Sequence, residues 1–212
     1  DLLEALQKGA RGSAHRAQRQ PGPTLESAPG EAVDATTLLE VIDWHVRRAP
    51  DRIAVIQTSE SGEHPITCRE LAQTAERVAA GLQHRGLETG QSVAIMLPTC
   101  PEYFSVYLGI LLAGGIPVPI YPPAHLAQVE EHVRRHVGIL CNARADLLVT
   151  IPEARAVAWL LRVHVPSLRA VVSVEDLLQS RKSLTRVPVV AQDVAFIQYT
   201  SVSTGDPKGV VL

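Results

Sequence analysis

Apolar positions recur along the chain with two different spacings, which predict helices that alternate with short strands. In five segments they recur every three or four positions, as on one face of a helix, at 37–49, 67–86, 99–114, 128–143 and 152–163. Runs rich in valine, isoleucine and leucine predict strands at 53–57, 92–97, 116–120, 146–150, 168–174, 194–200 and 210–212. A further short helix is expected at 175–180. Because strands that are apolar throughout are typical of a sheet covered on both faces, the sequence predicts an α/β fold with a mostly parallel sheet and crossover helices.

Start and stop signals support the predicted helices. Thr36 or Thr37 is expected to cap the first helix. The segments 67–70 and 99–102 both have the Thr-x-x-Glu form of a capping box, in which the two side chains satisfy free backbone N–H groups. The second helix is expected to end at Gly86 and to bury one apolar face, formed by Leu71, Ala75, Val78, Ala79 and Leu82.

The chain divides into two parts of different composition. Residues 1–35 are rich in glycine, alanine, proline, arginine and glutamine, which predicts a flexible leader or linker; a short helix at Leu2–Lys8 is the alternative. Residues 36–212 carry the regular pattern and predict the N-terminal part of a globular domain. Because the chain starts at Asp1 and its last apolar run reaches Leu212, we expect a fragment of a longer polypeptide.

Composition excludes several classes of protein. With 46% apolar residues and a net charge of −2, the chain is neither a largely disordered polypeptide nor a basic protein suited to nucleic acid. The longest uncharged stretch, 103–124, is interrupted by glycine and proline, so no transmembrane segment is expected. Cys68, Cys100 and Cys141 form no Cys-x-x-Cys pair, and we expect reduced thiols in a cytoplasmic protein.

The segment Tyr199–Gly209 is the main candidate for chemistry. It reads YTSVSTGDPKG and places hydroxyl side chains, two glycines and a lysine between two predicted strands. Hydroxyls and exposed loop N–H groups donate to phosphate oxygens, glycines allow close approach, and lysine adds positive charge. The segment is not the common P-loop, because Gly209 follows Lys208. Its composition favours a polyphosphate cradle or, as the alternative, a polar β-hairpin loop.

This segment resembles the phosphate-loop signature of the adenylate-forming superfamily, normally Tyr-Thr-Ser-Gly-Ser/Thr-Thr-Gly-x-Pro-Lys-Gly, and departs from it only at Val202. Two upstream blocks, Ile66–Leu71 and Leu111–Ile120, are similar to that family's "-TY-EL-" and "L-AGG--VPI" blocks. The resemblance covers about 36–212. The Tyr-Pro-Pro sequence at 121–123 and the pattern of 128–150 look most like fatty acyl-AMP ligases and long-chain acyl-CoA synthetases.

The resemblance implies an ATP-dependent ligase that uses Mg²⁺. A fatty acid would be activated to an acyl-adenylate and passed to the phosphopantetheine thiol of an acyl carrier protein or, in acyl-CoA synthetases, to coenzyme A. The catalytic lysine of the family is expected after Leu212, so no residue of this chain is assigned as catalytic. By the same resemblance, the residues that would hold the β- and γ-phosphates are Thr200, Ser201, Ser203, Thr204, Gly205 and Lys208.

Val202 stands where the family signature has glycine. A glycine there indicates positive φ or close backbone approach, both of which a β-branched residue resists. We therefore predict weakened ATP binding, and a non-catalytic remnant of the enzyme is the alternative function.

Three further groups of residues are interpreted as structural. His132 and His136 have the spacing of two metal ligands on a helix, but the neighbouring Arg134 and Arg135 favour a solvated helix face. Trp44 and Trp159 lie in helical patterns typical of core or interface residues. The side chains that either border an acyl pocket or, as the spacing favours, belong to the core are Tyr103, Phe104 and Tyr107.

Overall fold

A computed structural model describes residues 30–59, 62–122, 129–200 and 207–212. Its centre is a four-stranded parallel sheet with the strand order β4-β3-β5-β6, which confirms the predicted α/β class. Ala94 in the central strand pairs with Val118 on one side and with Leu148 on the other. The strands are β3 (Ser92–Met96), β4 (Ile116–Ile120), β5 (Ala145–Thr150) and β6 (Ala170–Ser173).

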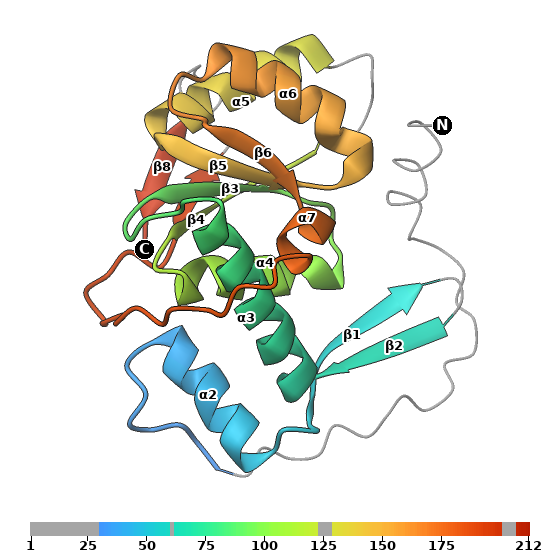
Figure 1. Cartoon of the computed structure of the whole chain (residues 1–212), viewed down its shortest axis with the longest axis vertical. Coiled ribbons are helices and arrows are strands. Elements are labelled where there is room, and N and C mark those ends of the chain that lie inside the picture. The colour runs from blue at the N-terminus through green and yellow to red at the C-terminus, as the bar shows by residue number, and fades with distance from the viewer. Residues whose placement is uncertain (1–29, 60–61, 123–128, 201–206) are drawn as a thin grey trace.

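Helices cover both faces of this sheet (Figure 1). On one face α5 (Val129–Asn142) and α6 (Arg155–His164) share an apolar core with the sheet. On the other face the sheet packs against α3 (Cys68–His84), α4 (Pro101–Leu112) and the short α7 (Val174–Leu178). Every residue of β3 is buried, because this strand is covered on both sides. The apolar character of the strands follows from this double coverage.

The ends of the predicted helices were correct in most cases. Thr67 caps α3 in a complete capping box with Glu70, all five predicted face residues of α3 are buried, and Gly86 adopts φ +81° after its last turn. The capping box predicted at 99–102 is wrong. The N-cap of α4 is Cys100, which makes no side-chain capping bond, because the helix begins at Pro101, one residue later than a Thr99 cap requires.

Two antiparallel hairpins flank the parallel sheet. The first joins β1 (Ile53–Ser59) to β2 (Gly62–Thr67), and the second joins β7 (Ile197–Thr200) to β8 (Lys208–Val211). The sequence analysis missed β2, because its residues are polar, include a proline and stay largely exposed. Strand β7 lies alongside β4 at the edge of the sheet.

The remaining elements follow the predicted order. α2 (Leu38–Arg48) is capped by Thr37 in a capping box with Glu40, and it packs on α3 without any fully buried residue. A 3₁₀ turn, η2 (Pro152–Ala154), precedes α6 where one continuous helix was expected. The leader at 1–29, with the alternative helix Leu2–Lys8, lies outside the described residues. Within the described ranges, no helix is long and apolar enough to cross a membrane.

Candidate functional site

The predicted phosphate loop joins β7 to β8. Thr200 is the last residue of β7 and Lys208 is the first of β8, and the two stand opposite each other in the antiparallel register. Both side chains are exposed. The structure therefore brings together the two ends of the proposed phosphate-binding segment. The residues between them that the sequence analysis named lie outside the described part of the chain, namely Ser201, Val202, Ser203, Thr204 and Gly205.

Alternation along β7 determines which way the ends of this loop face. Ile197 and Tyr199 pack against the core beneath α5, whereas Gln198 on the opposite face lines a cleft. Side chains two residues apart share one face of a strand, so Thr200 lies on the face of Gln198. Because directly paired residues of neighbouring strands also share a face, Lys208 stands on that side too.

Tyr199 anchors the hairpin to the rest of the molecule. Its hydroxyl donates a hydrogen bond of 2.5 Å to Oδ1 of Asn142 at the end of α5. Burial raises the pKa of Tyr199, which keeps this hydroxyl protonated as a donor at neutral pH. The ring lies across Gly209 on the paired strand, where a Cβ atom would stand only 2.9 Å from the Tyr199 Cζ atom. The loop thus starts and ends on backbone that is tied to the core.

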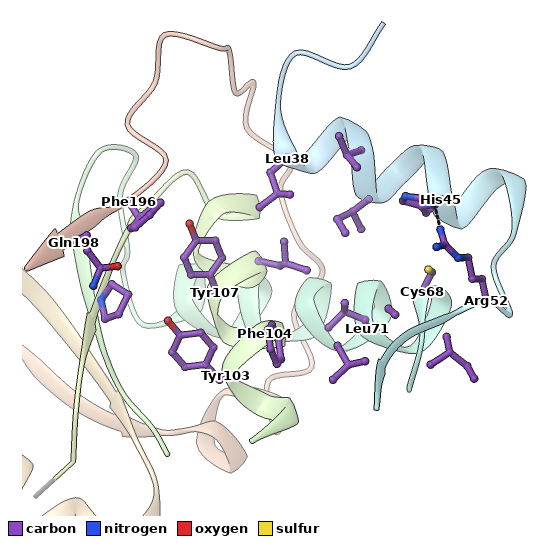
Figure 2. A pocket seen from close by; sticks show the side chains of 17 residues that line it. Leu38, His45, Arg52, Cys68, Leu71, Tyr103, Phe104, Tyr107, Phe196 and Gln198 are labelled. Atoms are coloured by element: carbon purple, nitrogen blue, oxygen red, sulfur yellow. Dashed lines mark hydrogen bonds between the residues drawn. The ribbon is translucent and has the colours of Figure 1, made fainter. Parts of the chain in front are cut away.

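An apolar cleft of about 610 Å³ opens beside the hairpin. Figure 2 shows Phe196 and Gln198 at one end of this cleft and His45, Cys68 and Arg52 at the other. A volume of this size, lined mostly by apolar and aromatic groups, is typical of a small-molecule site. The lining side chains come from α2, β1, α3, α4, β4 and β7, and include Leu38, Ile42, Val55, Leu71, Leu108 and Pro119.

Aromatic side chains form the wall of the cleft that lies nearest the hairpin, which we call the aromatic wall. Tyr103, Phe104 and Tyr107 of α4 line it, and the ring centroids of Tyr107 and Phe196 are 5.9 Å apart. The expectation that these α4 aromatics belong to the core is wrong for Phe104, which is 42% exposed. Tyr103 and Tyr107 are half-buried and pack against the core that contains Val106, and they also line the cleft. Helical spacing identifies a face but not which neighbour covers it.

Burial also determines the protonation state of the two tyrosines in this wall. Burial, with a smaller effect of the neighbouring Tyr103, raises the pKa of Tyr107 to about 12. Burial likewise raises the pKa of Tyr103. Both phenols therefore stay protonated at neutral pH and keep the wall uncharged, which suits an apolar ligand.

A guanidinium group stands at the opposite end of the cleft. Arg52 donates from a terminal nitrogen to Nδ1 of His45 over 3.3 Å, while its Nε atom is buried and makes no hydrogen bond. Burial and the adjacent Arg52 charge lower the pKa of His45, so the imidazole is neutral and accepts this bond. The sequence analysis did not single out Arg52, because nothing local distinguishes it from a surface arginine.

The structure corrects one expectation about the histidines. His136 is only 6% exposed and lies on the core side of α5, so it does not belong to a solvated helix face. The side chain of His132 lies outside the described part. Among the described residues no group of three or more histidine, cysteine or acidic side chains could hold a metal ion. Cys68, Cys100 and Cys141 are free thiols, and burial raises the pKa of Cys100 to about 11.

Comparison with known proteins identifies the family. A family model described as AMP-binding enzyme matches residues 42–212, and the chain belongs to that family. The fold agrees: the crystal structure of a fatty acyl-adenylate ligase from L. pneumophila, in complex with acyl adenylate and pyrophosphate, superposes with a TM-score of 0.73 and 27% sequence identity. That match covers 85% of this chain and 31% of the ligase.

Two curated relatives are larger synthetases. Pyochelin synthetase PchE from Pseudomonas aeruginosa is 32% identical over 198 residues, which are 92% of this chain and 12% of the synthetase. Malpibaldin synthetase from Mortierella alpina is 33% identical over 176 residues, covering 81% of this chain and 3% of the synthetase. The chain thus spans a small part of the relatives that it matches.

Proposed function

We propose that this chain forms the ATP-binding N-terminal part of an enzyme that activates a carboxylic acid as an acyl-adenylate. The observation that carries the proposal is the placement of Thr200 and Lys208 side by side at the mouth of the hairpin, on the face of β7 that lines the cleft. Membership in the AMP-binding enzyme family supports it. In this arrangement a triphosphate on the hairpin would lie beside a ligand in the cleft.

The proposed substrate is a fatty acid. The aromatic wall and the aliphatic side chains that continue it suit an apolar chain, and their area dominates the cleft. The similar L. pneumophila protein, which is a fatty acyl-adenylate ligase, supports the same substrate class. The proposed acceptor of the acyl group is the phosphopantetheine thiol of an acyl carrier protein, with coenzyme A as the alternative.

The chemistry assigns a role to the hairpin. A carboxylate oxygen attacks the α-phosphorus of ATP, the bond from that phosphorus to the bridging oxygen breaks, and pyrophosphate leaves with the bonding electrons. Negative charge grows on the departing oxygens, and the Lys208 ammonium and the Thr200 hydroxyl, which are paired across the hairpin, would stabilise it. The proposed Mg²⁺ would accompany the ATP phosphates and supply positive charge to the departing pyrophosphate.

Replacement of Lys208 tests the phosphate site directly. Charge-assisted hydrogen bonds contribute about 1.5–3 kcal/mol, so Lys208→Ala is expected to raise the Kd for ATP by at least about tenfold in calorimetric titrations. Lys182→Ala is the matched control, because Lys182 is also exposed but lies outside the hairpin. An ATP affinity that stays equal in the two variants would contradict the phosphate site.

Activity requires the full-length protein. Fatty-acid-dependent exchange of pyrophosphate into ATP is expected, and amino acids in place of the fatty acid are expected to give no exchange. Product analysis with an acyl carrier protein and with coenzyme A then identifies the acceptor. Exchange that depends on an amino acid instead would keep the adenylation chemistry and overturn the proposed substrate.

A second candidate function is a non-catalytic remnant. Val202, which replaces the glycine of the family signature in the phosphate loop, is the observation that favours it. In that case the full-length protein is expected to bind ATP weakly and to show no pyrophosphate exchange with any carboxylic acid. Exchange above background excludes this alternative.

A further inference from the structure

The outer face of α6 is apolar although it faces away from the core. Val157, Ala158 and Leu161 form the buried face of this helix. The α6 outer face, as we call it, lies on the opposite side with helical spacing i, i+3, i+4 and i+7, and consists of Ala156, Trp159, Leu160 and Val163. Trp159 is 47% exposed, Leu160 45% and Val163 77%. α6 is therefore apolar on two sides, and Trp159 does not lie in the core.

The ionisable side chains of α6 itself are all basic. The Arg162 guanidinium lies 4.7 Å above the Trp159 ring, and α6 contains no carboxylate. The thiol of Cys141 on α5 lies 4.0 Å from the His164 carbonyl oxygen. Arg134 is exposed and lies seven residues before Cys141, which places it on the same side of α5 two turns earlier. Of the nearby acids, Asp176 is paired with Arg155, while Glu153 is exposed in η2 just before α6.

The size and shape of the α6 outer face restrict its occupant. The face spans about two turns of one helix and amounts to a few hundred square ångströms, whereas a stable protein interface needs about 800 Å² on each partner. In a dimer formed through the α6 outer face, Arg162 and its basic neighbours would also lie against the same residues of the second copy, and these like charges would repel. α6 lies at the outside of the molecule (Figure 1).

We propose that the α6 outer face binds peripherally to an anionic lipid surface. Trp159, Leu160 and Val163 enter the boundary between headgroups and acyl chains, while Arg162 and Arg134 contact lipid phosphates. Tryptophan and basic residues have these positions on helices that lie in a membrane interface. A fluid bilayer can accept a small apolar face without a complementary surface of matching area. A protein partner would need such a surface.

Vesicle binding by the chain tests this inference. Cosedimentation is expected with vesicles of equal parts phosphatidylcholine and phosphatidylglycerol, and much less with phosphatidylcholine alone. The double variant Leu160→Gln/Val163→Gln is expected to weaken partitioning at least about tenfold, because two apolar side chains no longer leave water. Val33→Gln is the matched control, since Val33 is as exposed as Val163 but precedes α2. Arg162→Gln is expected to weaken binding about fivefold.

Tryptophan fluorescence provides a second readout. The chain has two tryptophans, so Trp44→Phe leaves Trp159 as the only one, and its emission is expected to shift to the blue on addition of the anionic vesicles. Equal vesicle binding by the α6 double variant and by Val33→Gln overturns the proposal. So does binding that is independent of lipid charge, or a dimer in sedimentation that only the α6 double variant abolishes.

Discussion

At Gly209 the β7–β8 hairpin has no room for a side chain. A Cβ atom would stand 2.9 Å from Cζ of Tyr199 and 3.0 Å from Cγ2 of Ile197, and both of these side chains pack against the core. Overpacking of this kind costs about 1–3 kcal/mol. The glycine next to the proposed phosphate-binding lysine is thus explained by packing of the tyrosine rather than by contact with a ligand.

Gly209→Ala is therefore expected to lower the free energy of unfolding by about 1–3 kcal/mol in urea titrations and to weaken ATP binding. Val210→Ala is the control, because Val210 is the next residue of the same strand and is 47% exposed. If Gly209→Ala unfolds at the same urea concentration as the unaltered chain, the close packing of the Tyr199 ring against Gly209 does not contribute to stability.

A substitution at Val202, in the neighbouring loop, is expected to have the opposite effect on ATP binding. Restoring the family glycine with Val202→Gly is expected to tighten ATP binding, because a valine in a backbone conformation that favours glycine costs about 1–3 kcal/mol. Titration with ATP measures this as a lower Kd. An unchanged Kd means that the loop accepts valine in ordinary backbone geometry and that the remnant hypothesis loses its main support.

Among the elements, α3 and α4 show how contact between helices overrides helix propensity. Gly109 lies in the middle of α4, where alanine is favoured by about 1 kcal/mol over glycine in an isolated helix. In this fold a Cβ atom at Gly109 would stand 2.7 Å from Cγ1 of Val78 and 2.9 Å from the carbonyl oxygen of Ala75 on α3. The glycine lets the two helices approach closely.

Gly109→Ala is accordingly expected to destabilise the protein by about 1–3 kcal/mol despite the better helix former. Gly138→Ala is the matched change in α5, where the added Cβ would meet Pro207 at an ordinary 3.4 Å, and its effect is expected to be neutral or slightly stabilising. Thermal unfolding followed by circular dichroism compares the two, and equal melting temperatures would contradict the close α3–α4 contact.

At the scale of the whole molecule, acid is expected to reduce stability in two steps. Burial lowers the pKa of His45 below its usual 6.5, so its contribution is complete above pH 6.5 and is lost as the pH falls through the lower folded-state value. Hydrogen bonds from backbone and hydroxyl groups lower the pKa of Glu40, Glu70 and Asp176. Their contributions are present above the ordinary carboxyl range near pH 4 and are lost below it.

Urea unfolding from pH 8 to pH 3 measures both steps. His45→Gln keeps an acceptor for Arg52 but does not titrate, so this variant is expected to lack the first step and to retain the second. If the first loss of stability is as large in His45→Gln as in the unaltered protein, groups other than His45 cause it.

The organisation of the molecule explains why the proposed site lies where it does. The hairpin packs along β4 at one edge of the sheet, and the aromatic wall of α4 approaches it from the neighbouring layer. The cleft joins residues from 38 to 198 and therefore exists only in the assembled fold. The α6 outer face belongs to the opposite helical layer, so lipid binding there leaves the cleft side accessible.

The amino-acid sequence was sufficient to predict the α/β class, the order of most elements and the position of the segment that resembles the family's phosphate loop. Capping boxes, helix-ending glycines and apolar periodicity act over a few residues, so they can be read along the chain, as at Thr67 and Gly86. Exceptions were the start of α4, where the pattern at 99–102 forms no cap, and β2, whose polar residues form a strand only because β1 pairs with them.

Other features depend on the assembled fold: Thr200 pairs with Lys208 on the side of β7 that carries Gln198, the α4 aromatics line the cleft, and His136 is buried. These properties depend on residues far apart in the sequence, such as Tyr107 and Phe196. A helical or strand pattern shows that a face exists, but the element that covers this face is chosen by the packing of the whole chain.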